Sequence, residues 1–172
     1  MINFIYFPTF QIPTIMVIFI RKIKYFQRGA TIMKILFYDT KSYDREFFEK
    51  LLPSYPGIEI KFIEANIHEE TAALAHGYDA ICAFVNADLG APVIEELHRQ
   101  GVKLILMRCA GYNNVDLETA ARCEIQVARV PGYSPEAVAE HAMALALTAN
   151  RHTHKAYIKC RENNFALNGL MG

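Results

Sequence analysis

The sequence has no tryptophan and only four cysteines in 172 residues, and no two cysteines stand in a C-x-x-C spacing. This scarcity excludes a small disulfide scaffold and argues against a cysteine zinc site or a redox dithiol. The chain also lacks an excess of either charge, with 18 basic and 18 acidic side chains, whereas proteins that bind nucleic acid usually carry a basic surplus. Hydrophobic residues make up 52% of the sequence, enough to form a buried core, and this excludes intrinsic disorder.

Acidic residues are absent from the first 38 positions, where all five charged residues are basic. From Met33 onward, 14 basic residues (18 minus four) stand against 18 acidic ones, a net charge of −4. The neutral total therefore combines a basic leader with an acidic body, and the two join near residue 33.

The leader has 14 apolar residues among its first 20, close to the roughly 20 that a membrane-spanning helix needs. Pro8 and Pro13 would kink such a helix, and the basic residues follow the apolar stretch, unlike those of a secretory signal. Three interpretations of residues 1–32 remain: an upstream extension outside the folded unit, a membrane anchor, or a buried element of the domain. We favour the extension, because Met33 and the apolar run after it resemble the beginning of a cytoplasmic α/β protein.

Short apolar runs alternate with helical patterns from Met33 onward. The predicted strands are 34–38, 58–63, 80–85, 103–107 and 125–130, and the predicted helices are 42–52, 71–76, 92–100, 116–123 and 135–151. This alternation is typical of a parallel sheet with helices on both faces, so we expect a flavodoxin-like doubly wound α/β fold. The strand at 58–63 alternates apolar with charged residues, which predicts either one face open to solvent or a place near the sheet edge.

The last predicted helix has the strongest local signal. Ser134 is suited to the N-cap, Pro135 to the first helical position, and Glu136 to the positive end of the helix dipole. Six alanines between residues 137 and 149 allow another element to approach closely. We expect this long helix to lie between two layers or two domains.

Ligands of an open parallel sheet bind beyond the carboxyl ends of its strands. Four predicted loops lie there, at 39–41, 86–90, 108–114 and 131–133. We expect Gly111 to permit a turn that other residues resist and its neighbouring amides to hold an anion. Val85 and Asn86 offer a second set of amides, so the loops predict a site for a small carboxylate.

Four motifs in register carry a family resemblance: Tyr38-Asp-Thr-Lys-Ser-Tyr-Asp44, Phe84-Val-Asn86, Arg108-Cys-Ala-Gly-Tyr-Asn-Asn-Val-Asp116 and Val130-Pro-Gly-Tyr-Ser-Pro-Glu-Ala-Val-Ala-Glu-His141. From about Met33 to Gly172 the chain resembles the NAD-dependent D-2-hydroxyacid dehydrogenases, in particular the fermentative D-lactate dehydrogenases. The resemblance implies a cytoplasmic enzyme that reduces pyruvate with NADH. The implied partners are a small 2-oxo or 2-hydroxy acid and, for the complete enzyme, further copies of itself, with neither nucleic acid nor a membrane.

The resemblance also assigns site residues. Amides matching Val85 and Asn86 hold the substrate carboxylate, with Phe84 and Gly111 as further substrate-binding candidates. Tyr133 is expected beside the cleft, at the hinge into the cofactor domain. The helix at 135–151 is expected between the domains and in subunit contacts.

The sequence departs from the family in one large respect, because it contains no Gly-x-Gly-x-x-Gly fingerprint for a dinucleotide. In relatives the Rossmann domain with that fingerprint, the catalytic Arg, its acidic partner and the general-acid His all follow the matched region. The resemblance thus assigns no catalytic and no cofactor-binding residue to this chain and predicts that it is inactive by itself. The expected divisions are a leader at 1–32, an incomplete substrate domain at 33–133, and an interdomain helix with the start of the cofactor domain at 134–172.

Several residues invite other interpretations. Relatives usually have Gly where this chain has Glu124, and a left-handed backbone there would cost on the order of 1 kcal/mol. His141 is expected to be packed rather than catalytic, and Cys109 to be a buried, reduced thiol; no metal site is expected.

The alternative function is a non-catalytic carboxylate-binding or partner-pairing module. A phosphoacceptor receiver domain is disfavoured, since it needs an Asp where the third strand is followed by Phe84-Val-Asn86.

Overall fold

The computed structural model describes residues 32–130, 132 and 134–172. The chain divides into two compact units, one up to residue 133 and one from residue 134. The expectations for residues 1–31, the membrane anchor among them, and for Tyr133 fall outside the described residues. In the part of the chain that is described, no helix combines the length and apolarity needed to cross a membrane.

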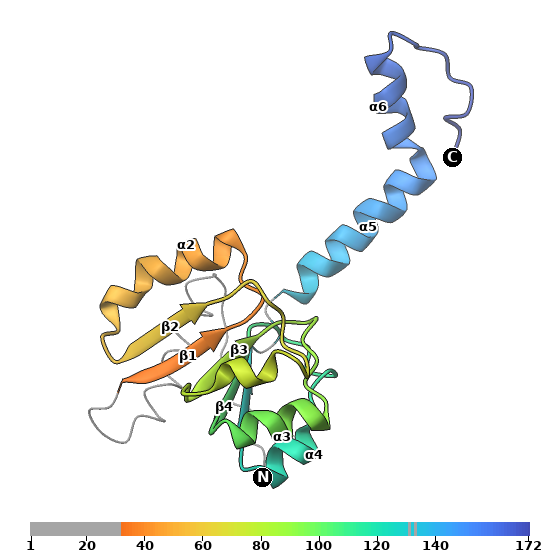
Figure 1. The fold of residues 1–172 in the computed structure, drawn as a ribbon. Coiled ribbons are helices and arrows are strands. Elements are labelled where there is room, and N and C mark those ends of the chain that lie inside the picture. Colours follow the sequence, from red (N-terminus) through yellow and green to blue (C-terminus); the bar gives the residue numbers. More distant parts are fainter. Residues whose placement is uncertain (1–31, 131, 133) are drawn as a thin grey trace. The chain divides into compact units, whose positions relative to one another are not determined.

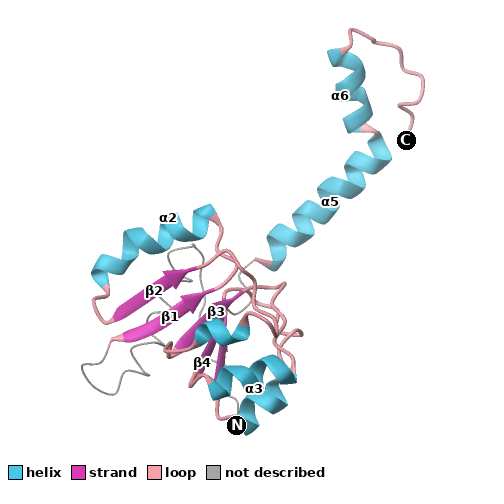
Figure 2. Ribbon diagram, viewed as in Figure 1, coloured by secondary structure: helices cyan, strands magenta, loops and turns pink. Residues whose placement is uncertain are grey.

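The first unit is built on a sheet of five parallel strands in the order β2-β1-β3-β4-β5. Figures 1 and 2 label β2, β1, β3 and β4 side by side in this order. The strands are β1 (Met33–Phe37), β2 (Ile58–Phe62), β3 (Ala80–Ala83), β4 (Leu104–Met107) and β5 (Gln126–Arg129). This is the order of flavodoxin-like folds, so the predicted fold class is confirmed. β2 lies at the edge of the sheet, which is one of the two alternatives that its alternating pattern predicts.

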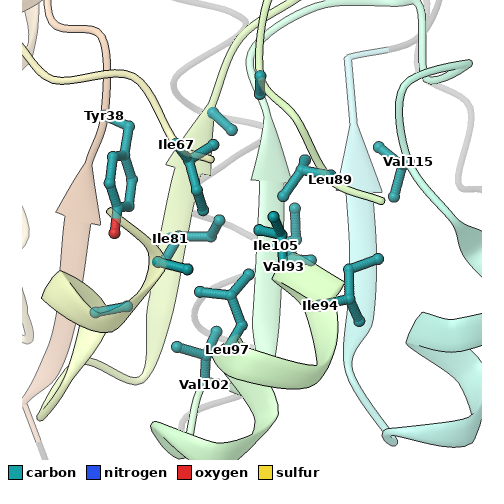
Figure 3. Close-up of a cluster of buried hydrophobic side chains, with 14 of the residues drawn as sticks. Tyr38, Ile67, Ile81, Leu89, Val93, Ile94, Leu97, Val102, Ile105 and Val115 are labelled. Atoms are coloured by element: carbon teal, nitrogen blue, oxygen red, sulfur yellow. The ribbon is translucent and has the colours of Figure 1, made fainter. Parts of the chain in front are cut away.

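Helices cover both faces of this sheet. They are α2 (Ser42–Leu51), α3 (Ala91–Arg99) and α4 (Leu117–Arg122), with 3₁₀ turns η1 (Leu52–Ser54) and η2 (Ala72–Ala75). On one face Val93, Ile94 and Leu97 of α3 pack on the sheet (Figure 3). On the other, Phe48 of α2 contacts Phe37, with ring centroids 5.0 Å apart. Neighbouring strand residues thus serve opposite cores, which explains why the central strands are continuously apolar.

Two predicted elements differ from the structure. The segment 71–76 forms the short 3₁₀ turn η2 and no α-helix. The Thr71 hydroxyl donates to the carbonyl of Asn66 (2.7 Å) and accepts from the amide of His68 (3.0 Å), so a side chain holds the turn at its start. The strand predicted at 80–85 ends at Ala83, because the chain turns at Phe84.

The second unit consists of α5 (Pro135–Arg151) and α6 (Thr153–Arg161). The Ser134 side chain caps α5, accepting from the amide of Ala137 at 3.4 Å. His152 adopts the left-handed conformation (φ 51°) and separates the two helices. The sequence does not predict α6, because the chain turns polar after His152 and five of the nine residues of this helix are polar or charged.

Glu124 occupies the left-handed position at the end of α4, with φ of 54°. The amide of Ile125 donates to the carbonyl of Ala120 (2.9 Å) and that of Glu124 to the carbonyl of Ala121 (3.1 Å). These two bonds form a Schellman motif, in which the residue at this position is usually glycine. The left-handed backbone is therefore kept at this position, on a residue with a Cβ.

We predict that Glu124→Gly raises the free energy of unfolding by about 0.5–1 kcal/mol, because the relieved left-handed strain exceeds the added entropy of glycine in the unfolded chain. Urea denaturation measures this. Asn163→Gly is the matched control, since Asn163 has the same φ of 54° but asparagine tolerates it, so the gain there should be smaller. A neutral or destabilising Glu124→Gly would contradict the prediction.

Candidate functional site

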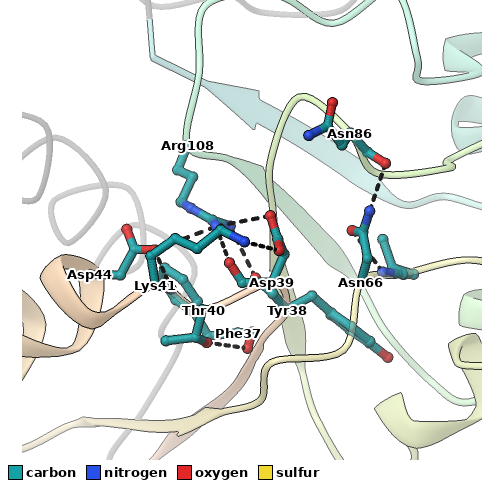
Figure 4. A network of polar contacts seen from close by, with 10 residues as sticks. Phe37, Tyr38, Asp39, Thr40, Lys41, Asp44, Asn66, Asn86 and Arg108 are labelled. Carbon is teal, nitrogen blue, oxygen red and sulfur yellow. Dashed lines mark hydrogen bonds and ion pairs between the residues drawn. The ribbon is translucent and has the colours of Figure 1, made fainter.

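The carboxyl edge of the sheet is organised around Arg108, which follows β4 and whose side chain is only 7% exposed. Its guanidinium donates to the carbonyl of Tyr38 (3.0 Å) and to that of Asp39 (2.6 Å) at the end of β1 (Figure 4). The same group lies over the rings of Phe37 (4.7 Å) and Phe84 (4.6 Å). Arg108 thus joins the ends of β1, β3 and β4.

Carboxylates neutralise this buried cation. Asp44 lies 3.5 Å and Asp39 3.8 Å from the guanidinium. Asp44 also accepts from the amide of Lys41 at 2.9 Å, which satisfies a donor at the start of α2. The Lys41 ammonium contacts Asp39 at 2.6 Å, and this hydrogen bond raises the lysine pKa. Two cations and two carboxylates balance, so this cluster holds the fold together and offers no net charge to an anion.

The turn after β3 presents the predicted carboxylate-binding amides. The amide of Ala87 donates to the carbonyl of Phe84 at 3.0 Å and closes the turn. Among residues 32–130 neither the Val85 nor the Asn86 amide donates a hydrogen bond, and both residues are exposed. Adjacent free amides are a suitable pair of donors for a carboxylate.

Two asparagines fix this turn from neighbouring loops. Asn66, after β2, donates through Nδ2 to the carbonyl of Asn86 at 2.7 Å (Figure 4). Asn114, after β4, donates in the same way to the carbonyl of Ala87 at 2.8 Å. Nothing in the sequence alone points to either side chain, although Asn114 stands in one of the four family motifs. The only available signal was a polar amide in a loop at the ligand edge.

Gly111 lies in the loop after β4. The expectation that its turn requires the conformational freedom of glycine is wrong. The positive-φ glycines among the described residues are Gly77, Gly101 and Gly169, and a Cβ at Gly111 would meet nothing within 4 Å. The loop is shaped by contacts to its carbonyls: Cys109 donates to that of Gly111 (3.3 Å) and Arg129 to that of Ala110 (2.8 Å). Side chains hold this turn, so it does not depend on the conformational freedom of glycine.

The described cysteines and histidines form no reactive centre. Burial raises the pKa of the Cys82 thiol to about 12 and also raises the pKa of Cys109, which is buried and unbonded to another cysteine as expected. His141 is exposed on α5, so the expectation that it is packed is wrong. Within the described ranges no three His, Cys, Asp or Glu side chains are grouped to hold a metal ion.

The described strand-to-helix turns of the first unit do not suit the pyrophosphate of a dinucleotide. Gly90 precedes α3, and the Asp88 carboxylate lies directly beside it: a Cβ added to Gly90 would be 3.3 Å from Asp88 Oδ1. The Gly90 amide already donates to that carboxylate at 3.1 Å. An acidic side chain therefore occupies the position that a phosphate would need.

Comparison with known proteins identifies the family. The sequence profile of the D-isomer specific 2-hydroxyacid dehydrogenase catalytic domain matches residues 35–166, and the chain belongs to this family. It is 48% identical over 140 residues to D-lactate dehydrogenase of Escherichia coli K12, covering 81% of this chain and 42% of that protein. It is 50% identical over 143 residues to a D-lactate dehydrogenase of Curvularia clavata, covering 81% of this chain and 41% of that protein.

Solved structures agree with the family. The apo structure of Escherichia coli D-lactate dehydrogenase matches with a TM-score of 0.70 at 48% identity, over 81% of this chain and 44% of that one. Aquifex aeolicus D-lactate dehydrogenase, complexed with NAD and lactic acid, matches with a TM-score of 0.61 at 25% identity, over 77% of this chain and 38% of that one. The chain spans about two fifths of the length of the relatives it matches.

We predict that Arg108→Met lowers the free energy of unfolding by about 3–5 kcal/mol, because it leaves buried Asp44 without its cation. Chemical denaturation measures the loss. Arg99→Met is the control: the Arg99 side chain is 63% exposed and pairs with Glu96 on the helix surface, so the change should be about 0.5 kcal/mol or less. Equal losses in the two variants would show that the buried cluster contributes no more to the free energy of unfolding than an exposed ion pair.

Proposed function

We propose that this chain supplies the substrate-binding part of an NAD-dependent D-lactate dehydrogenase, which reduces pyruvate to D-lactate. The observation that carries the proposal is the pair of exposed amides at Val85 and Asn86, which donate no hydrogen bond among residues 32–130 and lie in a turn fixed at the carboxyl edge of the sheet. Similarity to D-lactate dehydrogenases at 48–50% identity supports the choice of substrate class. The complete enzyme is proposed to be cytoplasmic and homo-oligomeric.

In this proposal the two amides bind the carboxylate of the 2-oxo acid, and the carbonyl to be reduced points away from the turn. Phe84, Gly111 and Tyr133 are the further proposed substrate-binding residues. Each amide-to-carboxylate bond contributes about 1.5–3 kcal/mol, because one partner is charged. The balanced cluster around Arg108 adds no net charge, so these bonds alone favour weak binding, in about the millimolar range.

Hydride transfer is not assigned to this chain. NAD is proposed as the cofactor of the complete enzyme, in keeping with the relative from Aquifex aeolicus, which binds NAD and lactic acid. The residues described here do not fit its pyrophosphate, and the family's catalytic groups are not matched within these 172 residues. The role proposed for the chain is to bind and orient the acid.

Pairing with another protein is the second candidate function. The observation that favours it is the exposed apolar side chains on α5, which include Val138, Met143 and Leu147. Co-elution of the purified chain with an intact family member in size-exclusion chromatography would support pairing, and a chain that stays monomeric would oppose it.

Carboxylate binding is tested by removing one amide donor. Val85 is the second residue of the turn Phe84–Ala87, a position that proline favours. We predict that Val85→Pro keeps the turn but weakens pyruvate binding at least about tenfold, the effect of one charge-assisted hydrogen bond. A ¹⁵N-resolved NMR titration measures the affinity.

Val85→Ala is the matched control for that titration. It removes the side chain but keeps the amide, so pyruvate should still shift the Val85 and Asn86 resonances. Acetone, which has the carbonyl but no carboxylate, should shift neither. Failure of pyruvate to move these two amides in the wild type would refute the proposed function.

We also predict that the purified 172-residue chain does not oxidise NADH in the presence of pyruvate. The physical reason is that hydride transfer needs the nicotinamide held against the substrate, and no dinucleotide fingerprint is present. The assay follows the absorbance of NADH at about 340 nm in the presence of pyruvate and compares its decrease with that of a blank without protein. Turnover above the blank would contradict the division of roles proposed here.

A further inference from the structure

Asn66 lies outside every motif used so far, yet its side-chain amide is the start of a chain of hydrogen bonds. Its Nδ2 donates to the carbonyl of Asn86 at 2.7 Å. That carbonyl belongs to the same peptide group as the amide of Ala87, which donates to the carbonyl of Phe84 at 3.0 Å. The Phe84 carbonyl in turn shares a peptide group with the amide of Val85. This series of hydrogen bonds therefore ends at the Val85 amide, which is exposed and donates to no residue among 32–130.

Such a chain has two physical effects. Each hydrogen bond polarises the next peptide group, so donation to a carbonyl makes the amide of the same peptide group a better donor. It also fixes the planes of the two peptide groups, because each is held at its carbonyl oxygen. A donor that is already oriented loses less entropy when a ligand binds.

Asn66 is itself held in place. Its Oδ1 accepts from the amide of Ile67 at 2.9 Å, and its own carbonyl accepts from the hydroxyl of Thr71 at 2.7 Å. Ile67 is 1% exposed and belongs to the core beneath α3. The side-chain amide is thus oriented with its oxygen toward the backbone of Ile67 and its nitrogen toward the turn.

Asn114 provides an internal comparison. It donates to the next carbonyl, that of Ala87, at 2.8 Å. The peptide group of that carbonyl carries the amide of Asp88, which donates to Ile67 at 3.1 Å and has no connection to Val85. Both asparagines fix the turn, but Asn66 alone of the two lies on the path that ends at a free amide.

We propose that Asn66 is a positioning residue, which orients and polarises the Val85 amide through the two peptide groups of the turn. This inference rests on the proposed binding of a carboxylate at that amide. It adds a residue from the loop after β2 to a site otherwise formed by the turn after β3.

The test uses two substitutions in the full chain, with pyruvate as the probe and NMR shifts of Val85 and Asn86 as the readout. Asn66→Asp keeps the acceptor for Ile67 but at pH 7.5 has no donor for Asn86. Asn66→Ala removes the donor without adding a charge. Pyruvate affinity should fall about threefold to tenfold in Asn66→Ala, the effect of one neutral hydrogen bond, and further in Asn66→Asp because of repulsion between carboxylates.

A pH profile separates donation from a merely structural role. A protonated Asp carboxyl is a donor again, so lowering the pH to about 3.4, below the ordinary aspartate pKa of about 3.9, should return Asn66→Asp toward the affinity of the wild type at the same pH. Asn66→Ala should show no such recovery. The matched control is Asn168→Asp, an exposed asparagine of the second unit, which should leave binding unchanged. Urea denaturation of each variant checks that it is folded.

The outcomes distinguish the two proposals. If pyruvate does not shift the wild-type Val85 amide, carboxylate binding fails and the role of Asn66 fails with it. If the wild type binds and both Asn66 variants bind as tightly, only the positioning role is overturned. The same holds if Asn66→Asp is weakened but does not recover at low pH.

Discussion

The first unit depends on one buried cation at the carboxyl edge of its sheet. Arg108 bonds the carbonyls of Tyr38 and Asp39, lies within 3.5 Å of the Asp44 carboxylate, and stacks on Phe84. A buried guanidinium is tolerated only when its charge and its donors are satisfied, so these partners must all be present together. The requirement fixes the end of β1, the start of α2 and the turn after β3 relative to one another, which gives the candidate site its rigidity.

The fold could be predicted from the sequence because it follows from local patterns. Apolar runs locate the five strands, the alternation at 58–63 locates the edge strand, and Ser134-Pro135 locates the start of α5. The pattern at 71–76 fails because the Thr71 hydroxyl bonds to the backbone, which no periodicity reveals. The left-handed backbone at Glu124 could only be raised as a condition, from the glycine usual in relatives, since glutamate carries no sign of that conformation.

The candidate site could be predicted only in part. Val85 and Asn86 are identifiable because they stand where a buried strand was predicted to end, whereas Phe84 was selected only through the family resemblance. The side chains that hold the turn, Asn66 and Asn114, come from other loops, and their partners are carbonyls that the sequence does not show. For the same reason Gly111 was given a conformational role that its backbone does not have.

The source of anion attraction follows from the charges around the turn. Arg108 and Lys41 are matched by Asp39 and Asp44, so this cluster adds stability but no positive potential. A carboxylate at Val85 and Asn86 would therefore be held by amide dipoles alone, in a position open to water, where each bond replaces one to solvent. Tight binding then needs a second charged partner and exclusion of water. Neither is supplied by the described residues around this turn, so binding to this chain alone is expected to be weak.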